Sequence, residues 1–274
     1  MSENKIKAYW HVCDNFGDML TPYLIKKITN IDPDFTSLKA KTEADPFIVV
    51  GSILGCSVKR GIVWGAGCAF ESDLNPECFS PPSKNFNIIA TRGKLSKALV
   101  EQAGHKPIAY GDPGLLLPRF YTPKVVPENN IGIICSWVDY DDVLVAYGSE
   151  MPVINSLTTS VEDTIDMIYK CKTIISSCLH GLVVAAAYGI PTVWVEFSDR
   201  MMGDGFKFRD FFSSIEQDAY VPIDLKNKLD YNELIKLPFR HTFNINLQQL
   251  YDCCPFKDIR AEDKDINVAE PEQT

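Results

Sequence analysis

The sequence predicts an α/β fold in which two domains with parallel sheets enclose a central cleft. Short apolar runs typical of buried strands alternate with longer segments of helical periodicity along the 274 residues. Most predicted strands are followed by a turn that contains glycine or short polar residues. The stretch 118–130 carries three prolines and is predicted to link two sets of elements. Because ligands of parallel sheets bind beyond the carboxyl ends of the strands, we expect the turns to converge on a pocket.

The N-terminal set begins with a largely apolar and aromatic strand over 8–12. Its first helix, 19–28, carries Pro22 in the first turn, where the missing N–H breaks no hydrogen bond. Further apolar runs that end at glycine or at a polar turn predict the other strands. The remaining N-terminal elements are strands over 47–50, 62–64, 87–90 and 108–110 and a helix over 94–102.

The C-terminal set begins with a strand over 131–135. Val161, Ile165 and Ile168 lie near one face of a helix predicted over 161–171. The remaining elements are strands over 152–154, 173–175 and 192–195 and helices over 182–188, 206–214 and 247–254.

The predicted domains are an N-terminal domain, 1–120, and a C-terminal domain, 121–240. A C-terminal helix and an acidic tail follow over 241–274, and the tail after Pro255 is predicted to be mobile.

Composition restricts the classes of protein to consider. A hydrophobic fraction of 46% and a charged fraction of 23% are typical of a soluble globular protein, and a net charge of −9 argues against a nucleic-acid partner. The start MSENKIKAYW is unlike a signal peptide and no apolar run is long enough to span a bilayer, so we expect a cytoplasmic protein. Nine cysteines without a CxxC pair, Cys56 and Cys78 among them, predict buried thiols rather than disulfides or a metal site.

The most informative stretch is TIISSCLHGLVVAAAYGIPTVWVEF, residues 173–197. It predicts a strand, a helix and a second strand, with His180 at the start of the helix and Ser176 and Ser177 as candidate caps. A helix N-terminus suits an anion, and a histidine beside that anion can move a proton. The alternatives are a structural histidine or a nucleophilic Cys178, and the second is disfavoured because residues two apart point in different directions.

The turn after the first strand holds Asp14, Asn15, Gly17 and Asp18. Polar side chains here suit sugar hydroxyls, and Asp18 can accept a hydroxyl proton. The alternative is an Asx turn in which Asp18 caps the following helix.

Two glycine turns and one arginine also follow strands. Gly51-Ser52 and Gly65-Ala66-Gly67 can offer N–H groups to an anion, although simple tight turns explain them equally well. They do not complete a dinucleotide fingerprint, so a dehydrogenase is disfavoured. Arg92 suits two-point contact with a carboxylate or phosphate, and its alternative is an ion pair.

The ordered segments NFGDMLTPYL, FIVVGS, VWGAG, ATRGKLSKALV, GDPGLLLP and SSCLHGLVVAAAYGIPTVWVE resemble those of the polysaccharide pyruvyl transferases. The resemblance implies a GT-B-like fold of two Rossmann-like domains. It implies transfer of an enolpyruvyl unit from phosphoenolpyruvate to two hydroxyls of a sugar, which gives a pyruvate ketal and phosphate without a further cofactor. Such reactions serve bacterial exopolysaccharide, capsule and cell-wall polymer synthesis, and the acceptor sugar is lipid-linked at the inner membrane surface or nucleotide-linked.

The resemblance also implies that the N-terminal domain, 1–120, lies on the acceptor side and the C-terminal domain, 121–240, on the donor side. It implies roles for residues as well. His180 matches the general acid–base of the family, and Asp18 is the second candidate catalytic residue. The candidate donor-binding residues are Arg92, Ser176, Ser177, Gly51, Ser52, Gly65, Lys207 and Arg209. The candidate acceptor-binding residues are Asp14, Asn15 and Gly17.

Cys178 departs from the family pattern, because many members have a donor-binding arginine there. Lys207 or Arg209 then compensates, or the donor differs. Gly93 stands where an aspartate is frequent. Because a helix N-terminus disfavours imidazolium and bound anions favour it, we expect His180 to gain a proton more readily with donor bound.

Two further classes of function stay open at this point. A GT-B-type glycosyltransferase with a nucleotide-sugar donor would share the architecture and the cleft. A non-catalytic binding protein on the same scaffold would explain the loss of the arginine at Cys178. The sequence identifies neither the acceptor sugar nor the oligomeric state.

Overall fold

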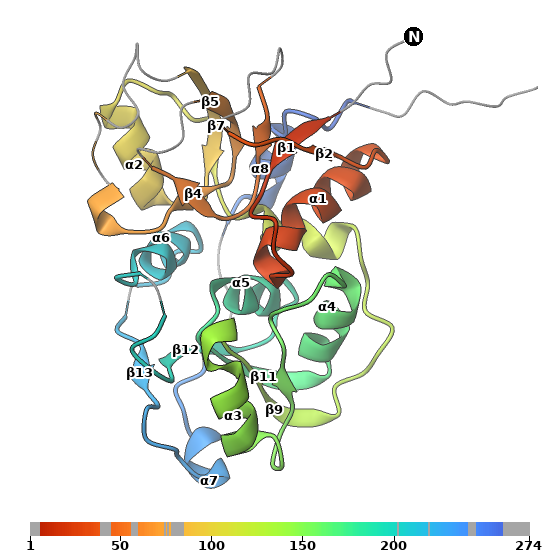
Figure 1. Cartoon of the computed structure of the whole chain (residues 1–274), viewed down its shortest axis with the longest axis vertical. Coiled ribbons are helices and arrows are strands. Elements are labelled where there is room, and N and C mark those ends of the chain that lie inside the picture. Colours follow the sequence, from red (N-terminus) through yellow and green to blue (C-terminus); the bar gives the residue numbers. More distant parts are fainter. Residues whose placement is uncertain are drawn as a thin grey trace, which may run out of the picture.

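The computed structural model describes residues 6–38, 45–55, 60–73, 75, 77, 85–201, 203–218, 220–240 and 245–259. Two sheets, both with parallel strands, lie one above the other in Figure 1, and helices pack around each. This arrangement confirms the predicted α/β class with Rossmann-like parallel sheets. Of the tail predicted after Pro255, Phe256 is buried in the core, and residues 260–274 lie outside the described residues, as do Cys56 and Cys78.

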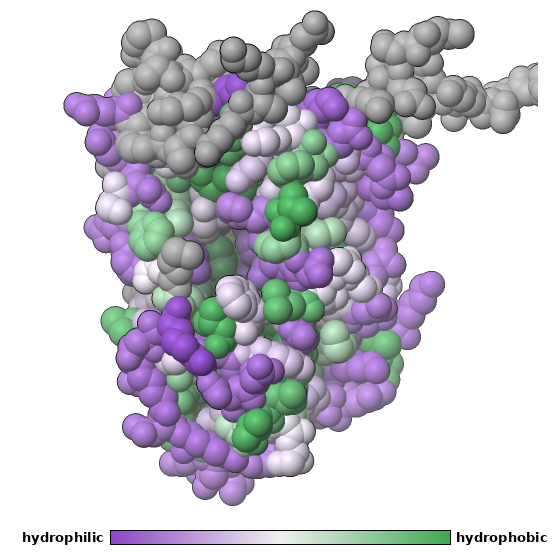
Figure 2. Space-filling model, viewed as in Figure 1, coloured by the Kyte–Doolittle hydropathy of each residue, from purple (hydrophilic) through white to green (hydrophobic). Residues whose placement is uncertain are grey.

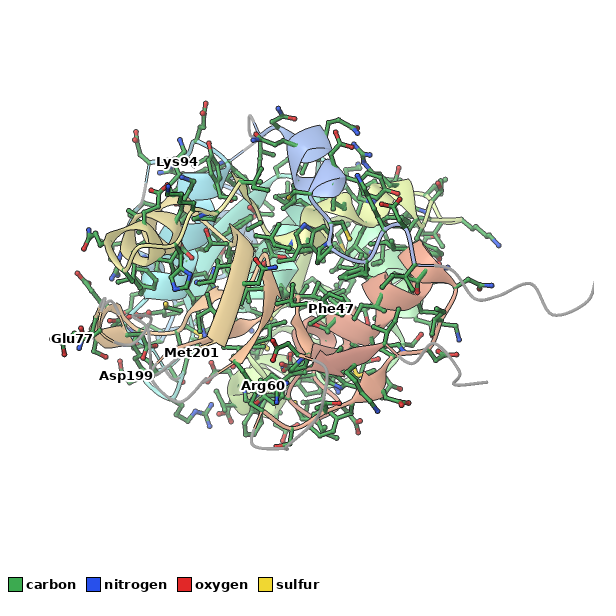
Figure 3. The ribbon with its side chains drawn as sticks, turned by 90° about the horizontal axis from the view of Figure 1, so that it is seen from above. Phe47, Arg60, Glu77, Lys94, Asp199 and Met201 are labelled. Atoms are coloured by element: carbon green, nitrogen blue, oxygen red, sulfur yellow. The ribbon has the colours of Figure 1, made fainter. Side chains whose placement is uncertain are left out.

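The N-terminal sheet has the strand order β2-β1-β3-β5-β7-β8. Its strands are β1 (Lys7–Tyr9), β2 (Asp34–Phe35), β3 (Phe47–Ile48), β5 (Arg60–Trp64), β7 (Asn85–Thr91) and β8 (Ala109–Tyr110). Two short strands, β4 (Ser52–Leu54) and β6 (Gly67–Cys68), pair beyond its carboxyl edge. The helical elements of this half are α1 (Phe16–Thr29), η1 (Glu71–Asp73), α2 (Lys94–Gln102) and η3 (Pro113–Arg119). Figure 3 shows α2 on one side of the sheet and α1 and the C-terminal helix α8 (Leu247–Asp252) on the other.

The C-terminal sheet has the strand order β10-β9-β11-β12-β13. Its strands are β9 (Asn129–Ile134), β10 (Val153–Ile154), β11 (Cys171–Ser176), β12 (Thr192–Glu196) and β13 (Ile223–Asp224). The helical elements are η4 (Trp137–Asp139), α3 (Tyr140–Tyr147), α4 (Val161–Tyr169), α5 (Leu179–Ala187), α6 (Phe206–Ser214), α7 (Tyr231–Leu234) and α8 (Leu247–Asp252). The central strand β11 pairs with β9 and β12, which places its carboxyl end in the middle of the sheet edge.

The two halves share one continuous core. A single cluster of buried side chains contains Leu20 of α1 and Val184 of α5. The C-terminal segment returns to the N-terminal half, where the Leu250 carbonyl accepts the indole N–H of Trp64 at 2.9 Å. Phe256 packs edge-to-face against Trp64 and Phe47. The predicted boundary near residue 120 falls between the two sheets, and the division into domains stays a prediction.

Two predicted helix caps are wrong. Helix α1 begins at Phe16 because the Asn15 side chain accepts the N–H of Gly17 at 3.0 Å, so Asn15 rather than Asp18 is the cap. Helix α5 begins at Leu179 with Cys178 at the cap position, which places His180 second in the helix.

Helix α3 was not predicted. Its sequence, YDDVLVAY, exposes Leu144 and Val145, so the apolar positions do not mark a single buried face. None of the described helices combines the length and the apolar character that a bilayer-spanning helix needs.

Candidate active site

Three helical elements begin around the side chain of His180. His180 is the second residue of α5, and Gly17 is the second residue of α1. A Cβ atom at Gly17 would lie only 2.0 Å from His180 Nδ1, so the two helix starts touch. Asp112, the cap of η3, approaches the other side of the ring. Because helix N-termini carry partial positive charge, this junction favours an anion and disfavours a cation.

One nitrogen of His180 and one carboxylate oxygen of Asp112 face each other, and neither has a hydrogen-bond partner among the described residues. His180 Nε2 lies 3.7 Å from Asp112 Oδ2, and both atoms are buried and unpartnered among the described residues. Burial, with help from the cations Arg92 and Lys207, lowers the pKa of His180 to about 3. Burial raises the pKa of Asp112 to about 6. The ligand-free site therefore holds a neutral imidazole beside a carboxylate at neutral pH.

Lys207 of α6 adds positive charge near His180, and it also acts on the Cys178 thiol. Burial lowers the pKa of Lys207, and the nearby Cys178 partly offsets that shift. Burial raises the pKa of the Cys178 thiol, while the Gly181 N–H and Lys207 act to lower it. Lys207 thus lies close enough to both residues to influence their ionisation. Figure 2 shows the surface hollowed between the two halves, beside α6 and the start of α1.

Asp18 lies in the first turn of α1 and is partly buried, and its negative charge also raises the pKa of the Cys178 thiol. Burial raises the pKa of Asp18, and His11 and Cys13 oppose that shift. Asp14 is exposed on the preceding turn. The structure therefore brings Asp18 and Gly17 to the His180 junction, while the Asn15 amide is occupied by capping α1.

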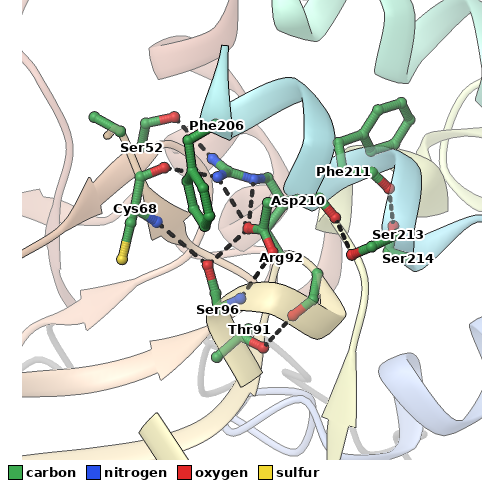
Figure 4. A network of polar contacts seen from close by, with 12 residues as sticks. Ser52, Cys68, Thr91, Arg92, Ser96, Phe206, Asp210, Phe211, Ser213 and Ser214 are labelled. Carbon is green, nitrogen blue, oxygen red and sulfur yellow. Dashed lines mark hydrogen bonds and ion pairs between the residues drawn. The ribbon is translucent and has the colours of Figure 1, made fainter. Parts of the chain in front are cut away.

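Arg92 is fully buried in a network that joins the two halves (Figure 4). Its Nε and Nη2 atoms lie 3.1 and 2.9 Å from Asp210 Oδ2 of α6. Its Nη1 donates to Ser52 Oγ and its Nη2 to the Cys68 carbonyl, each at 2.7 Å. Ser96 donates its amide and its hydroxyl to the two oxygens of Asp210. In this geometry Arg92 connects α6 to the N-terminal half, and donor binding by Arg92 stays a prediction.

The glycine turns pack against neighbouring turns. The Gly65 N–H donates to the Ala90 carbonyl, and a Cβ at Gly65 would lie 2.2 Å from Cδ of Pro113. Gly65 and Gly51 both have positive φ angles, +97° and +127°, which favour glycine. The Gly51 carbonyl accepts the N–H of Gly67. Glycine is therefore needed here for backbone conformation and close packing, and the Gly65 amide is not available to an anion.

The two serines before His180 support its backbone. Ser176 Oγ accepts the Cys178 N–H at 3.0 Å and donates to the Ile134 carbonyl at 2.8 Å. Ser177 Oγ accepts the backbone N–H of Ser136 at 3.0 Å. Both serines are buried, so they tie the start of α5 to the end of β9.

Arg209 lies on a partly exposed face of α6. Its guanidinium donates to Glu71 Oε2 and to the Asp204 carbonyl, both at 2.8 Å. Its side chain is 31% exposed. Of the two basic residues predicted to compensate for Cys178, only Lys207 acts on the pKa of His180.

Asp112 is the residue that the sequence analysis missed. The signal was present, because Asp-Pro-Gly directly after a strand is a typical helix start with proline at the first helical position. Its proximity to His180, 68 positions along the chain, depends on the packing of η3 against α5.

Comparison with known proteins assigns this chain to a family. A family model described as polysaccharide pyruvyl transferase matches residues 7–199, which is more than half of the chain. The chain belongs to the polysaccharide pyruvyl transferase family. The match contains Asp18, Arg92, Asp112 and His180, whereas α6 with Lys207 lies beyond it.

This family member is also similar to an uncharacterized protein of Acanthamoeba polyphaga mimivirus. The two are 28% identical over 250 residues, which cover 85% of this chain and 84% of the viral protein. No solved structure matches the chain. No group of three or more His, Cys, Asp or Glu suited to a metal ion occurs within the part of the chain that the structure describes.

Asp112→Asn is expected to stabilise the protein at pH 7. The pKa of Asp112 is raised from 3.8 to about 6, so the folded state penalises the carboxylate above pH 6 and not below pH 4. An asparagine can keep the bond that the Gly114 N–H makes to Asp112 Oδ1. We expect the free energy of unfolding to rise by about 3 kcal/mol at pH 7, with the gain vanishing near pH 4. Urea denaturation at both pH values measures this, and an equal gain at both would contradict it.

Proposed function

We propose that this protein transfers an enolpyruvyl unit from phosphoenolpyruvate to two hydroxyls of a sugar and forms a pyruvate ketal. Family membership supports a pyruvyl transferase. The observation that carries the finer proposal is the setting of His180, whose ring lies where two helix starts, Asp112 and Lys207 meet. A donor with a carboxylate and a phosphate suits the positive potential of this junction.

The proposed chemistry needs one proton donor and one proton acceptor. The methylene carbon of phosphoenolpyruvate takes a proton, and a sugar hydroxyl attacks the adjacent carbon. The bond from that carbon to the phosphate oxygen breaks, and the second hydroxyl attacks the same carbon. One hydroxyl proton thus ends on the new methyl group and the other on phosphate, so the reaction is balanced.

Bound donor changes the protonation of His180 in this proposal. Arg92 and Lys207 lower the pKa of His180 in the ligand-free protein. A dianionic or trianionic donor opposes their field and raises that pKa, because opposite charge favours imidazolium. His180 then delivers its proton to the methylene carbon, and it is neutral again when a hydroxyl must lose one.

Lys207 takes the place of the missing arginine in this proposal. It lies in α6, near enough to Cys178 and His180 to act on the ionisation of both. Asp18 and Gly17 line the acceptor side, with the sugar carried on a lipid at the inner membrane surface or on a nucleotide. The two predicted domains supply one side each.

The reaction is tested by incubating the protein with phosphoenolpyruvate and galactose-, mannose- or glucose-type acceptors. We expect release of inorganic phosphate together with an acceptor whose mass has increased by one pyruvate ketal. Release of a nucleotide from a nucleotide sugar instead would indicate a glycosyltransferase. Binding of phosphoenolpyruvate without turnover of any acceptor would indicate a non-catalytic binding protein.

His180→Gln is expected to lower kcat for ketal formation by ~10²–10⁴-fold, the usual contribution of general acid–base catalysis. Glutamine retains a polar side chain of similar reach but cannot exchange the proton. The matched control is His105→Gln, beyond the C-terminal end of α2, which should keep wild-type kcat. Full activity of the His180→Gln variant would refute the assignment.

A further inference from the structure

The two ring nitrogens of His180 have different surroundings. Nε2 is buried, lacks a hydrogen-bond partner and lies 3.7 Å from Asp112 Oδ2, which also lacks one. Buried polar atoms in folded proteins are nearly always hydrogen-bonded. An N–H group and a carboxylate oxygen are complementary, and the 3.7 Å between these two atoms exceeds a normal hydrogen-bond distance by less than ~1 Å. The pair is therefore poised to form one hydrogen bond.

Asp112 is held so that only one of its oxygens can turn toward the ring. Its Oδ1 accepts the Gly114 N–H at 2.9 Å, and its carbonyl accepts the N–H of Leu115 at 2.9 Å. Pro113 packs against Gly65, which fixes the start of η3. The residue is fully buried, so Oδ2 has no water-exposed alternative position.

The opposite edge of the ring faces the start of α1. A Cβ atom at position 17 would lie 2.0 Å from His180 Nδ1 and 2.7 Å from its Cε1. The side chain of His180 is 12% exposed, and Nε2 contributes almost nothing to that exposed area. Glycine at position 17 thus lets the start of α1 pack against the Nδ1 edge beside Asp18, and Nε2 is the fully buried ring nitrogen.

We propose that Asp112 is a positioning residue that accepts the Nε2–H of His180, so that Nδ1 is the nitrogen that exchanges the proton with substrate. The statement about substrate rests on the proposed function, whereas the tautomer of His180 does not. Asp112 fixes which nitrogen carries the lone pair, because a neutral imidazole holds a proton on only one of them.

The charges around the pair fit this role. Arg92 and Lys207 act against imidazolium from the N-terminal half and from α6. Asp112 is the carboxylate that faces the ring at 3.7 Å. Arg92 lowers the pKa of Asp112, and Asp210 raises it. Asp18 and Cys178 lie on the far side, where Asp18 acts on the Cys178 thiol. An ionised Asp112 is therefore the acceptor that can fix the single proton of the neutral ring on Nε2.

The test measures the tautomer of His180 by ¹⁵N-histidine NMR at pH 7.5 without substrate. His180 is assigned by the signals that disappear in His180→Gln. We expect the Nε2–H tautomer in the wild type. In Asp112→Asn the amide oxygen keeps the Gly114 bond, so the NH₂ group faces Nε2, donates to it and forces the Nδ1–H tautomer.

The same variant has a kinetic signature. With Nδ1 already protonated, the ring has no lone pair for substrate, so kcat should fall on the order of 10²–10⁴-fold. KM for phosphoenolpyruvate should stay nearly unchanged, because Asp112 does not contact the donor. The matched control is Asp166→Asn, a carboxylate that accepts the Tyr121 hydroxyl proton away from His180, which should alter neither the tautomer nor kcat.

Three outcomes would overturn the proposal. They are an Nδ1–H tautomer in the wild type, an unchanged tautomer in Asp112→Asn, and full kcat in that variant. The wild-type spectrum decides the question even where Asp112→Asn does not fold. If the wild type shows the expected tautomer but makes no ketal, the proposed function fails and the Asp112–His180 pairing stands.

Discussion

Asp210→Ala is expected to lower the free energy of unfolding by about 3–5 kcal/mol, the usual cost of leaving a buried charge without its partner. Asp210 and Arg92 are both fully buried, and Asp210 also accepts the amide and hydroxyl of Ser96. Alanine at 210 leaves the Arg92 guanidinium and the Ser96 N–H without their acceptor. Urea denaturation followed by circular dichroism and by fluorescence measures the loss.

The matched control for this prediction is Glu71→Ala. Glu71 pairs with Arg209 of the same helix α6, but the two side chains are 67% and 31% exposed. Exposed ion pairs contribute only about 0–1 kcal/mol, so this variant should be nearly as stable as the wild type.

A second variant separates the buried charge from simple loss of packing. Arg92→Met combined with Asp210→Ala removes both charges, so the double variant should be more stable than Asp210→Ala alone. Equal losses in Asp210→Ala and Glu71→Ala, or a double variant less stable than Asp210→Ala, would show that the ion pair does not hold α6 to the N-terminal half.

Gly17→Ala is expected to lower kcat by ~10²-fold or more, since displacement of a catalytic group by about 1 Å has effects of this size. The new methyl group would lie 2.0 Å from His180 Nδ1, so either the ring or the first turn of α1 must move. The φ angle of Gly17 is not in the left-handed region, so backbone strain is not the cause. Steady-state kinetics with phosphoenolpyruvate measures kcat, and urea denaturation should show a loss of about 1–3 kcal/mol.

A double-mutant cycle tests whether the collision with His180 is the cause. In a His180→Ala background the methyl group has room, so Gly17→Ala should then cost little or no stability. In that background Gly17→Ala should even raise the free energy of unfolding slightly, because alanine is a better helix former than glycine. The same loss of stability in both backgrounds would place the effect elsewhere in α1.

Local patterns were sufficient to predict several elements correctly. Helices α2 and α6 begin and end at the predicted residues, Lys94–Gln102 and Phe206–Ser214. In both, a glycine cap precedes a segment of helical periodicity, and both signals lie within one short stretch of sequence. The strands β4 and β6 were not predicted because they begin within the glycine turns at 51–52 and 65–67, where glycine interrupts the apolar pattern.

The same distinction between local and long-range features applies to the candidate site. The position of His180 at a helix start depends on neighbouring residues, and the sequence predicted it. The buried pairing of Arg92 with Asp210 joins residues 118 positions apart, and the approach of Asp112 to His180 depends on the packing of η3 against α5. Such contacts depend on how whole elements pack together, and a single sequence carries no local signal for them.

The return of the C-terminal segment to the first sheet has a consequence for how the chain is made. Trp64 and Phe47 are covered by Leu250 and Phe256, and Leu250 follows Trp64 by 186 positions along the chain. During synthesis, part of the apolar surface of the first half therefore stays exposed until this later segment has been made. Nascent chains that have not yet reached Phe256 expose that surface, so the N-terminal half is a site where we expect chaperones to bind during synthesis.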